Sequence, residues 1–417
     1  MPKIKIEGGH TLSGTIDISG AKNSAVALVP AAVLCDEITS ISNVPNISDI
    51  DSLEEILKHL NVSVKKDKDN IIIDSSKMIN TNINSELSSK LRASYYFMGA
   101  LLGKCHKVDM HFPGGCSIGK RPIDLHLKGF KELGATVIEE NDHIVIEAEE
   151  LIGNKIYLDI PSVGATINIM LAAVKAKGCT IIENAAQEPE IVNVAMYLNN
   201  MGAQITGAGT NLIRIVGVDY LKSAIHEVIP DRIEAGTYLI IASLLGKDLT
   251  INKVIPNHLD ALISKLQEAG VKMDIGDDYI RINEVGKYKA VKVKTLVYPG
   301  FPTDLQQPLI PFLTQCKGSS KVEETIWENR FLNIFDTVNM GANIKVIDNR
   351  VAIIKGVTPL VGKEVSATDL RGGASMLICG LIASGTTTID NINYILRGYD
   401  DIVNKLKKVG AKIELID

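Results

Sequence analysis

The 417-residue sequence lacks the features that direct a chain into or across a membrane. It contains no run of about 18 uninterrupted apolar residues, the length that a membrane-spanning helix requires. Its first residues, from Met1 to Glu7, alternate charged and apolar side chains and do not form the apolar core of a signal peptide. We therefore expect a cytoplasmic protein that makes no contact with a membrane.

Patterns typical of metal ligands and of redox-active cysteine pairs are also missing. The six cysteines never form a Cys-x-x-Cys pair and the eight histidines are scattered, so no metal site is expected. A chain of this length can bury a full core without disulfides. We expect five of the cysteines to be small buried side chains and treat Cys116 separately. The five are Cys35, Cys105, Cys179, Cys316 and Cys379.

Neither the charge nor the composition is extreme. With 44 Lys and Arg against 49 Asp and Glu, the net charge of −5 argues against a broad basic surface for nucleic acid. The 14 prolines and 34 glycines are too few for a fibrous or low-complexity chain. At about 100 to 200 residues per domain, the length predicts two or three globular domains.

One five-residue phrase recurs six times along the sequence. Successive copies lie 68 to 73 residues apart, so six repeats of about 70 residues account for nearly the whole chain. The Gly that most copies carry should end a helix before a strand begins. The copies read Leu-Asn-Val-Ser-Val from 60, Leu-Gly-Ala-Thr-Val from 133, Met-Gly-Ala-Gln-Ile from 201, Ala-Gly-Val-Lys-Met from 269, Met-Gly-Ala-Asn-Ile from 340 and Val-Gly-Ala-Lys-Ile from 409.

Each repeat predicts two kinds of helix. An amphipathic helix precedes the phrase, as the spacing of Leu53, Ile56 and Leu60 indicates. Further upstream, segments that are apolar on every side predict fully buried helices at 25–34, 167–174, 238–245 and 375–382. Strands lie between and after the helices, so the sequence predicts an α/β fold whose sheets enclose buried helices. In the fifth repeat, Pro308 and Pro311 should kink or shorten the buried helix.

Polar side chains of dissimilar kinds stand at the predicted starts of these buried helices. Helix N-termini present free N–H groups and the positive end of the helix dipole, which favour phosphate and carboxylate ligands. Because equivalent ends of several helices carry such side chains, we expect them to face shared space and to form an anion site. The residues are Lys22, Asn23, Arg92, Ser162, Arg232, Glu234, Asp304, Asp369 and Arg371.

Arginine is scarce, and its placement supports this interpretation. Nine of the 44 basic residues are Arg, and six of the nine lie in predicted loops or helix starts. Arg is favoured over Lys where planar, bidentate pairing with carboxylate or phosphate is required. One such Arg could equally tie down a loop through an acidic neighbour, whereas six together favour anion binding. The six are Arg92, Arg121, Arg232, Arg330, Arg371 and Arg397.

A Gly-rich segment at 113–122 replaces the short strand-to-helix turn of other repeats. It places Cys116 close to Lys120 and Arg121, whose charges would stabilise a thiolate. A glycine-rich turn with an unreactive cysteine has the same appearance, so the segment alone does not decide between the two.

At this segment the sequence resembles the UDP-N-acetylglucosamine 1-carboxyvinyltransferase family of enolpyruvyl transferases. Ten motifs match in order over essentially the whole chain, which is far more specific than any single one of them. The motifs occupy 18–25, 91–94, 113–126, 162–166, 183–190, 230–237, 301–304, 328–331, 367–371 and 397–399.

The resemblance implies an inside-out α/β barrel fold with two domains of three repeats each. Domain 1 would cover 22–229, and domain 2 would cover 1–21 and 230–417, with the N-terminal strand returning to domain 2 and the active site in the cleft between them. The implied reaction moves the enolpyruvyl group of phosphoenolpyruvate to the 3-hydroxyl of UDP-N-acetylglucosamine through a tetrahedral ketal and releases phosphate. It is the first committed step of peptidoglycan synthesis, hence of cell shape and division, and needs no metal or organic cofactor.

The resemblance also assigns roles to individual residues. Cys116 matches the general acid, which can form a covalent adduct with the substrate and is the target of the inhibitor fosfomycin, and Asp304 matches the base for the sugar hydroxyl. Lys22 and Arg397 match catalytic residues that hold phosphoenolpyruvate. The implied substrate-binding residues are Lys22, Asn23, Arg92, Arg121, Pro122, Asp124, Leu125, Ser162, Val163, Gly164, Asp304, Ile326, Arg330, Arg371 and Arg397.

Three positions depart from the family pattern, and two alternatives remain. Ile160, Gln187 and Leu396 stand where a Lys, an Arg and an Asp are expected, which leaves the diphosphate contacts and loop closure open. One alternative is shikimate 3-phosphate 1-carboxyvinyltransferase, against which stand the Cys loop and the Gly-Ala-Lys-Asn motif. The other is a catalytically silent paralogue with a regulatory role, against which stands the complete set of expected acid, base and anion-binding residues.

Overall fold

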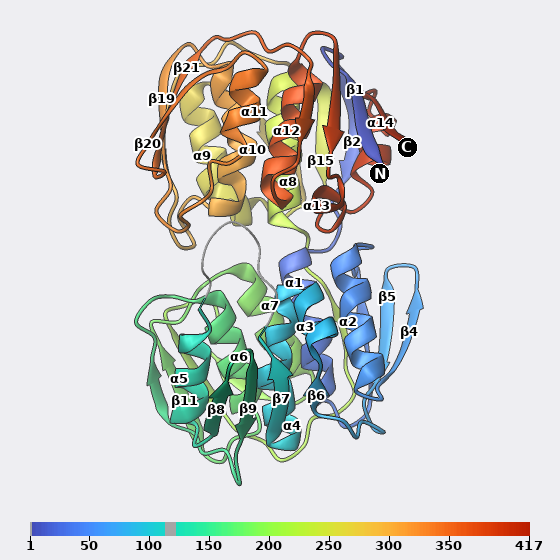
Figure 1. Cartoon of the computed structure of the whole chain (residues 1–417), viewed down its shortest axis with the longest axis vertical. Coiled ribbons are helices and arrows are strands. Elements are labelled where there is room, and N and C mark those ends of the chain that lie inside the picture. Colours follow the sequence, from blue (N-terminus) through green and yellow to red (C-terminus); the bar gives the residue numbers. More distant parts are fainter. Residues whose placement is uncertain (1, 113–121) are drawn as a thin grey trace. The chain divides into compact units, whose positions relative to one another are not determined.

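The computed structural model describes residues 2–112 and 122–417, which divide into two compact units (Figure 1). The first unit comprises 20–112 and 122–229, and the second comprises 2–19 and 230–417. Each unit has a hydrophobic core of its own. The predicted site residues Cys116 and Arg121 lie outside the described residues.

Six helices of the described chain are buried on nearly all sides, as predicted from segments without a polar face. In the second unit, α10 contacts both α8 and α12, and the three stand together with strands on either side (Figure 1). In the first unit, α4 contacts both α1 and α6. The six are α1 (Lys22–Ala31), α4 (Tyr96–Cys105), α6 (Val163–Ala173), α8 (Arg232–Leu245), α10 (Gln306–Thr314) and α12 (Leu370–Ile382).

Proline shortens two of these helices. Helix α10 has nine residues, against 14 in α8 and 13 in α12, and a 3-10 turn, η4 (Thr303–Leu305), precedes it. The predicted shortening of this helix is confirmed. Helix α1 also contains a proline, Pro30, and passes into the 3-10 helix η1 (Ala32–Leu34), so the predicted uninterrupted helix over 25–34 was wrong at its end.

Amphipathic helices cover the outside of the units and end at the recurring phrase. The second residue of the phrase is in the left-handed region in all six copies, with φ of 62° at Asn61 and between 93° and 114° at the five glycines. Gly and Asn adopt this conformation most easily, so the predicted helix stop is confirmed. The helices are α2 (Ser48–His59), α5 (Asp124–Glu132), α7 (Pro189–Asn200), α9 (Asp260–Ala269), α11 (Ile334–Asn339) and α14 (Ile402–Lys408).

The described strands form six four-stranded sheets, three in each unit. In every sheet one strand pairs in parallel with a central strand, which then pairs with an antiparallel partner. In the first unit the orders are β14 (Ile225–Glu227), β3 (Ile38–Ser42), β5 (Asn70–Asp74), β4 (Ser63–Asp67); β6 (Asn82–Ile83), β7 (Lys107–His111), β9 (His143–Glu147), β8 (Thr136–Glu140); and β10 (Lys155–Tyr157), β11 (Cys179–Glu183), β13 (Leu212–Val216), β12 (Gln204–Thr206).

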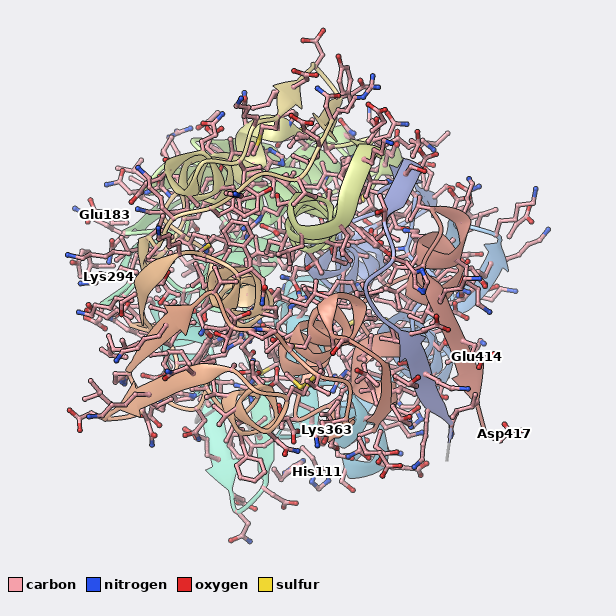
Figure 2. The ribbon with its side chains drawn as sticks, turned by 90° about the horizontal axis from the view of Figure 1, so that it is seen from above. His111, Glu183, Lys294, Lys363, Glu414 and Asp417 are labelled. Atoms are coloured by element: carbon pink, nitrogen blue, oxygen red, sulfur yellow. The ribbon has the colours of Figure 1, made fainter. Side chains whose placement is uncertain are left out.

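The N-terminal strands complete two sheets of the second unit. Strand β1 pairs between β23 and β24, and β2 pairs in parallel with β15, with Ile16 beside Ile251. Charged side chains such as Lys294 on β18 and Glu414 on β24 point away from the sheets of this unit (Figure 2). The orders are β2 (Leu12–Asp17), β15 (Gly246–Asn252), β17 (Tyr279–Ile282), β16 (Asp274–Ile275); β18 (Lys292–Lys294), β19 (Gly318–Glu323), β21 (Val351–Gly356), β20 (Asn343–Ile347); and β22 (Glu364–Ser366), β23 (Thr386–Asp390), β1 (Lys3–Glu7), β24 (Lys412–Ile416).

The prediction for the cysteines was partly wrong. Cys35, Cys316 and Cys379 are buried as expected, and burial raises the pKa of the Cys316 and Cys379 thiols to about 12. Cys105 is exposed, because it ends α4 just before a left-handed residue turns the chain outward, and Cys179 is half-buried at the start of β11.

Candidate active site

The polar residues predicted at the starts of the buried helices lie at those starts. Lys22 and Asn23 open α1, and the Ser162 hydroxyl caps α6 by accepting a hydrogen bond from the Ala165 N–H (3.3 Å). Arg232 opens α8, and its guanidinium lies over the ring of Tyr298 at 5.5 Å. Within the first unit, the start of α6 follows β10, which pairs in parallel with β11, and the first N–H groups of a helix have no partner inside it.

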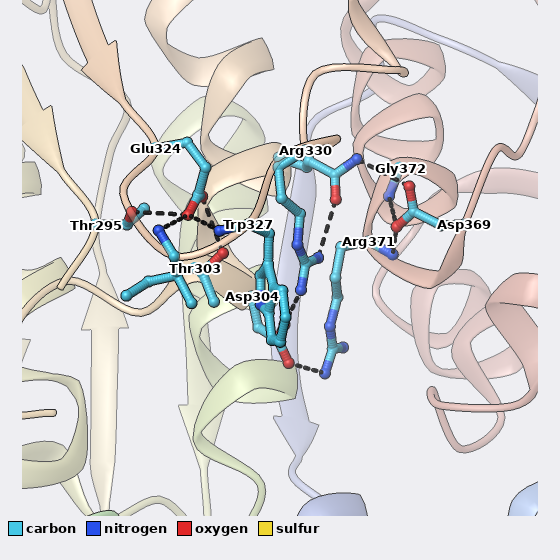
Figure 3. A network of polar contacts seen from close by, with 11 residues as sticks. Thr295, Thr303, Asp304, Glu324, Trp327, Arg330, Asp369, Arg371 and Gly372 are labelled. Carbon is cyan, nitrogen blue, oxygen red and sulfur yellow. Dashed lines mark hydrogen bonds and ion pairs between the residues drawn. The ribbon is translucent and has the colours of Figure 1, made fainter. Parts of the chain in front are cut away.

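In the second unit, Asp304 lies between two buried arginines (Figure 3). Its Oδ1 accepts from Arg330 Nη2 at 2.7 Å and its Oδ2 from Arg371 Nη2 at 3.1 Å. The two arginine side chains are 3% and 4% exposed, whereas Asp304 is 25% exposed and remains accessible to a ligand. The two guanidinium groups hold this carboxylate, and the buried Asp369 adds a second negative charge to the same network.

Asp304 could also have been an ordinary helix cap, but the geometry differs from that. Neither η4 nor α10 has a side-chain hydrogen bond at its N-terminus. The cap of α12 is instead Asp369, which accepts from the N–H groups of Arg371 (3.0 Å) and Gly372 (3.1 Å).

Two uncharged side chains, Gln307 and Tyr399, also contact the two arginines. Gln307 accepts from Arg330 Nη1 (3.2 Å) and donates through its Nε2 to Asp369 (3.0 Å), while the Arg371 guanidinium lies over the ring of Tyr399 at 5.4 Å. Sequence reasoning missed Gln307, because an amide within an apolar helical segment gives no functional signal. These contacts restrict the orientation of both guanidinium groups, whose Nε atoms are buried without a hydrogen-bond partner among the described residues.

In the first unit, Lys22 pairs with a carboxylate that the sequence analysis did not identify. Its Nζ lies 2.8 Å from Asp49 on α2, and the side chains are 13% and 6% exposed. Asp49 stands in the first turn of an amphipathic helix, where an acidic residue is ordinary, and so carried no distinct signal.

A second cluster of the first unit joins Arg92 to the start of α6 through His126. Arg92, in η2 (Arg92–Tyr95), lies over the Tyr95 ring at 5.9 Å, and that ring meets His126 edge-on at 4.9 Å. A Cβ on Gly164 would come within 3.0 Å of the His126 ring, so only glycine lets this helix start approach the imidazole.

The protonation of His126 follows from its partners. Burial, and secondarily the charge of Arg92, lowers the pKa of His126 to about 3. Asn168 Oδ1 accepts from the Gly99 N–H (2.8 Å), so its Nδ2 donates to His126 Nδ1 (2.9 Å). The neutral ring therefore carries its proton on Nε2, which faces Gly164 and can donate. His126 ends the recognised motif at 113–126, and that position was the signal available in the sequence.

The other predicted positions lie near helix ends. Pro122 and Asp124 are exposed where α5 begins, next to the buried Leu125, and Val163 is half-buried as the first residue of α6. Ile326 is half-buried in the loop before Arg330. Arg397 follows α13 (Asn393–Leu396), which packs against α12. Of the departures from the family pattern, Ile160 is 63% exposed, whereas Gln187 and Leu396 are half-buried.

Two further short helices, which carry none of these positions, are α3 (Ser85–Lys90) and η3 (Pro256–Leu259).

Two absences apply to the residues that the structure describes. No three His, Cys, Asp or Glu side chains among them are grouped so that they could bind a metal ion. None of the helices in 2–112 and 122–417 combines the length and the apolar composition that crossing a membrane demands.

Comparison with known proteins places this arrangement in a family. The model of the EPSP synthase (3-phosphoshikimate 1-carboxyvinyltransferase) family matches residues 6–406. UDP-N-acetylglucosamine 1-carboxyvinyltransferase 2 of Listeria innocua is 52% identical over 99% of this chain and 97% of its own length, and that of Bacillus cereus is 51% identical over 99% and 96%.

Solved structures agree with these matches. The enolpyruvyl transferase NikO from Streptomyces tendae superposes with a TM-score of 0.90 at 25% identity, covering 99% of this chain and 98% of its own. EPSP synthase from Acinetobacter baumannii superposes with a TM-score of 0.78 at 17% identity over the full length of both chains, which establishes the shared fold. With both the fold and the identity in agreement, the chain belongs to the UDP-N-acetylglucosamine 1-carboxyvinyltransferase family of enolpyruvyl transferases.

Proposed function

We propose that the protein transfers the enolpyruvyl group of phosphoenolpyruvate to the 3-hydroxyl of UDP-N-acetylglucosamine and releases phosphate. The observation that carries the proposal is the Asp304 carboxylate held between Arg330 and Arg371, at a position that matches the family's base. Two guanidinium groups fix the orientation of this carboxylate, and a general base must first be positioned within reach of the proton that it takes.

Binding of phosphoenolpyruvate requires cations, because the substrate carries a phosphate and a carboxylate. We assign this role to Lys22 and Arg397, with Arg92, Arg121, Arg330 and Arg371 as further cations. Helix starts with free N–H groups add to the positive potential.

The sugar nucleotide is assigned to a separate set of residues. The helix starts at Asp124 and Ser162 offer N–H groups to its diphosphate, and the neutral His126 offers an Nε2 donor beside Gly164. The residues in this role are Asn23, Arg121, Pro122, Asp124, Leu125, Ser162, Val163, Gly164, Asp304 and Ile326.

The chemistry then needs one base and one acid. Asp304 takes the proton of the sugar 3-hydroxyl, whose oxygen bonds to C2 of phosphoenolpyruvate while Cys116 delivers a proton to the C3 methylene. The product is a tetrahedral ketal. Loss of a proton from C3 restores the double bond as the C2–O bond to phosphate breaks, so the phosphate leaves with the electron pair of that bond.

Two further assignments follow from the family. We propose that fosfomycin, which mimics phosphoenolpyruvate, alkylates Cys116, and that the protein acts in the cytoplasm in peptidoglycan synthesis, with consequences for cell shape and division. Shikimate 3-phosphate is not favoured as acceptor, because the 52% identity is to enzymes named for the UDP sugar, whereas the EPSP synthase structure shares 17%.

The test is release of phosphate from phosphoenolpyruvate, measured with UDP-N-acetylglucosamine, with shikimate 3-phosphate and with no acceptor. We expect release with the UDP sugar alone. Release that ignores the sugar would refute the acceptor, and sugar binding without any release would favour the silent paralogue.

A further inference from the structure

Glu324 is a buried carboxylate that none of the proposed steps uses. It lies directly after β19 and is 1% exposed. Its Oε1 accepts hydrogen bonds from Thr295 Oγ1 (3.0 Å), the Ile326 N–H (2.8 Å) and the Trp327 N–H (3.1 Å). Its Oε2 accepts from Thr303 Oγ1 (2.9 Å), so four donors converge on one side chain (Figure 3).

In three other repeats, the residue directly after the central strand makes fewer hydrogen bonds than Glu324 does. There an Asn follows the central strand, and its Nδ2 makes one 2.8 Å hydrogen bond to the end of the parallel neighbour. The bonds are Asn43 to the Val228 carbonyl, Asn184 to the Leu158 carbonyl and Asn391 to the Ser366 hydroxyl. Thr295 likewise follows the parallel strand β18, so the bond from Thr295 to Glu324 is the fifth repeat's version of this tie. In those three repeats the Asn is in the left-handed region, with φ between 54° and 56°, and one short amide makes this tie.

The longer side chain of Glu324 accepts three additional hydrogen bonds, and their donors lie near the candidate site. Thr303 directly precedes Asp304, and the N–H groups of Ile326 and Trp327 belong to the loop that leads to Arg330. Burying a carboxylate is unfavourable unless its oxygens are fully hydrogen-bonded, so these four donors and the carboxylate hold one another in a single arrangement.

We propose that Glu324 is a positioning residue for the reaction proposed above, on which this inference rests. Through Thr303 it fixes the Asp304 carboxylate, and through the Ile326 N–H it fixes a segment assigned to the sugar nucleotide. A single group thus sets the base and the acceptor site relative to each other. Glu324 itself is buried and touches neither substrate. Misplacement of a reacting group by about 1 Å lowers rates by about a hundredfold, so such a group matters without taking part in the chemistry.

The first test is Glu324→Asn, which installs the side chain that three other repeats use. The Asn side chain can still reach Thr295, but it is one methylene too short to accept the hydrogen bonds from Thr303 and from the Ile326 and Trp327 N–H groups as well. We expect a stable protein whose kcat is about tenfold to a hundredfold lower, with a raised KM for UDP-N-acetylglucosamine because the Ile326 segment is released.

The second test distinguishes the effect of Glu324 on Asp304 from its effect on the loop that contains Ile326. Thr303→Val removes one hydrogen bond and keeps the shape, so kcat should fall by about tenfold while the KM for the sugar nucleotide stays within about twofold. Thr303→Ser keeps the hydroxyl and should recover most of that turnover. Thr314→Val is the control, because Thr314 is fully buried where Thr303 is half-buried, donates to the Pro311 carbonyl at 2.6 Å and lies at the other end of α10.

The outcomes are distinct. If the wild-type protein releases no phosphate, the proposed function is refuted, and the inference about Glu324, which rests on it, is refuted with it. If the wild type is active, the inference is overturned by Thr303→Val with unchanged kcat, by Thr303→Ser as impaired as Thr303→Val, or by an equal loss in Thr314→Val. Should Glu324→Asn fail to fold, the Thr303 pair still decides.

Discussion

Two adjacent glutamates illustrate what single residues reveal in the sequence and what they conceal. Glu323 is half-buried and pairs with Lys294 and Lys321, both at 3.3 Å, whereas Glu324 is buried and accepts four hydrogen bonds. The signal was strand periodicity: Ser320 and Val322 point inward, and Glu324 continues that alternation. An inward-facing Glu is unusual enough to indicate a buried network.

Asp304→Asn tests the proposed base at the same scale. The amide keeps the shape but takes up no proton, so turnover should fall by at least about a hundredfold. It also removes the negative charge between two buried arginines, and we expect a loss of about 1 to 3 kcal/mol in the free energy of unfolding. Phosphate release and thermal unfolding measure the two effects.

Asp248→Asn is the matched control, because Asp248 pairs with Arg281 at 2.9 Å but both side chains are about half exposed. It should change stability by no more than about 0.5 kcal/mol and leave turnover intact. Turnover of Asp304→Asn near that of the wild type would exclude Asp304 from the mechanism.

Cysteine labelling tests the proposed acid. Fosfomycin should modify Cys116 most rapidly when the UDP sugar is bound, and peptide mass mapping identifies the modified residue. Cys116→Ala should abolish both labelling and most turnover, whereas Cys116→Asp should escape labelling and keep activity, because a carboxylic acid can still deliver a proton.

Cys105 provides the internal control for accessibility. It is the exposed cysteine of the described chain, so an agent that reacts with any accessible thiol would modify it as well. An adduct on Cys105, or none on Cys116 with the sugar present, contradicts the assignment.

At the scale of elements, local chemistry made most of the fold predictable. The recurring phrase and the helices without a polar face each follow from a short segment, and apart from the end of α1 they are found where expected. The end of α1 was predicted less well, since Pro30 lies within a segment whose apolar character indicated a continuous helix. Likewise Asp49 and Gln307 take their roles from neighbours distant in sequence, and although strand alternation places Glu324 inward, no local pattern indicates that it meets Thr295 and Thr303.

The left-handed helix ends give a prediction for the repeated element. A Cβ on Gly202 would meet no atom within 4 Å, so the effect of Gly202→Ala comes from the backbone, with φ at 105°. We expect the free energy of unfolding to fall by about 1 to 2 kcal/mol. Gly202→Asn should lower it less, because Asn tolerates this region and occupies the equivalent position at Asn61. Denaturant unfolding measures both, and equal losses would place the cause elsewhere.

At the scale of the whole molecule, the least predictable feature is the route of the chain between units. It leaves the second unit after Ser19 and returns at Pro230, so that β2 pairs with β15 across more than 200 residues of sequence. Within the second unit, the Asp231 N–H donates to the Ser19 carbonyl (2.9 Å), which holds the departing and returning segments together. Loop closure over such a distance has no local signature, and only the family resemblance indicated it.

A buried carboxylate at this crossover should make stability depend on pH. Glu234 Oε2 accepts from the Ser19 N–H (2.9 Å), and its Oε1 accepts from Lys405 Nζ (2.7 Å). Burial raises the pKa of Glu234 to about 7, although Lys405 opposes the shift and Asp231 adds to it. In the unfolded chain the group titrates near its ordinary value of 4.5.

The sign follows from where the proton binds. Between about pH 4.5 and 7 the folded state holds a proton that the unfolded state has lost, so this contribution to stability is complete below about pH 4.5 and is lost as pH rises through about 7. Glu234→Gln cannot titrate and lacks this slope. The melting temperature of the wild type minus that of Glu234→Gln should therefore decrease between about pH 5 and pH 8. Glu268→Gln, which removes an exposed carboxylate 2.7 Å from Lys265, is the control for loss of a surface Glu–Lys pair and should show a smaller change. A difference that stays constant over this range would mean that Glu234 is ionised throughout and that its ion pair with Lys405 dominates at the crossover.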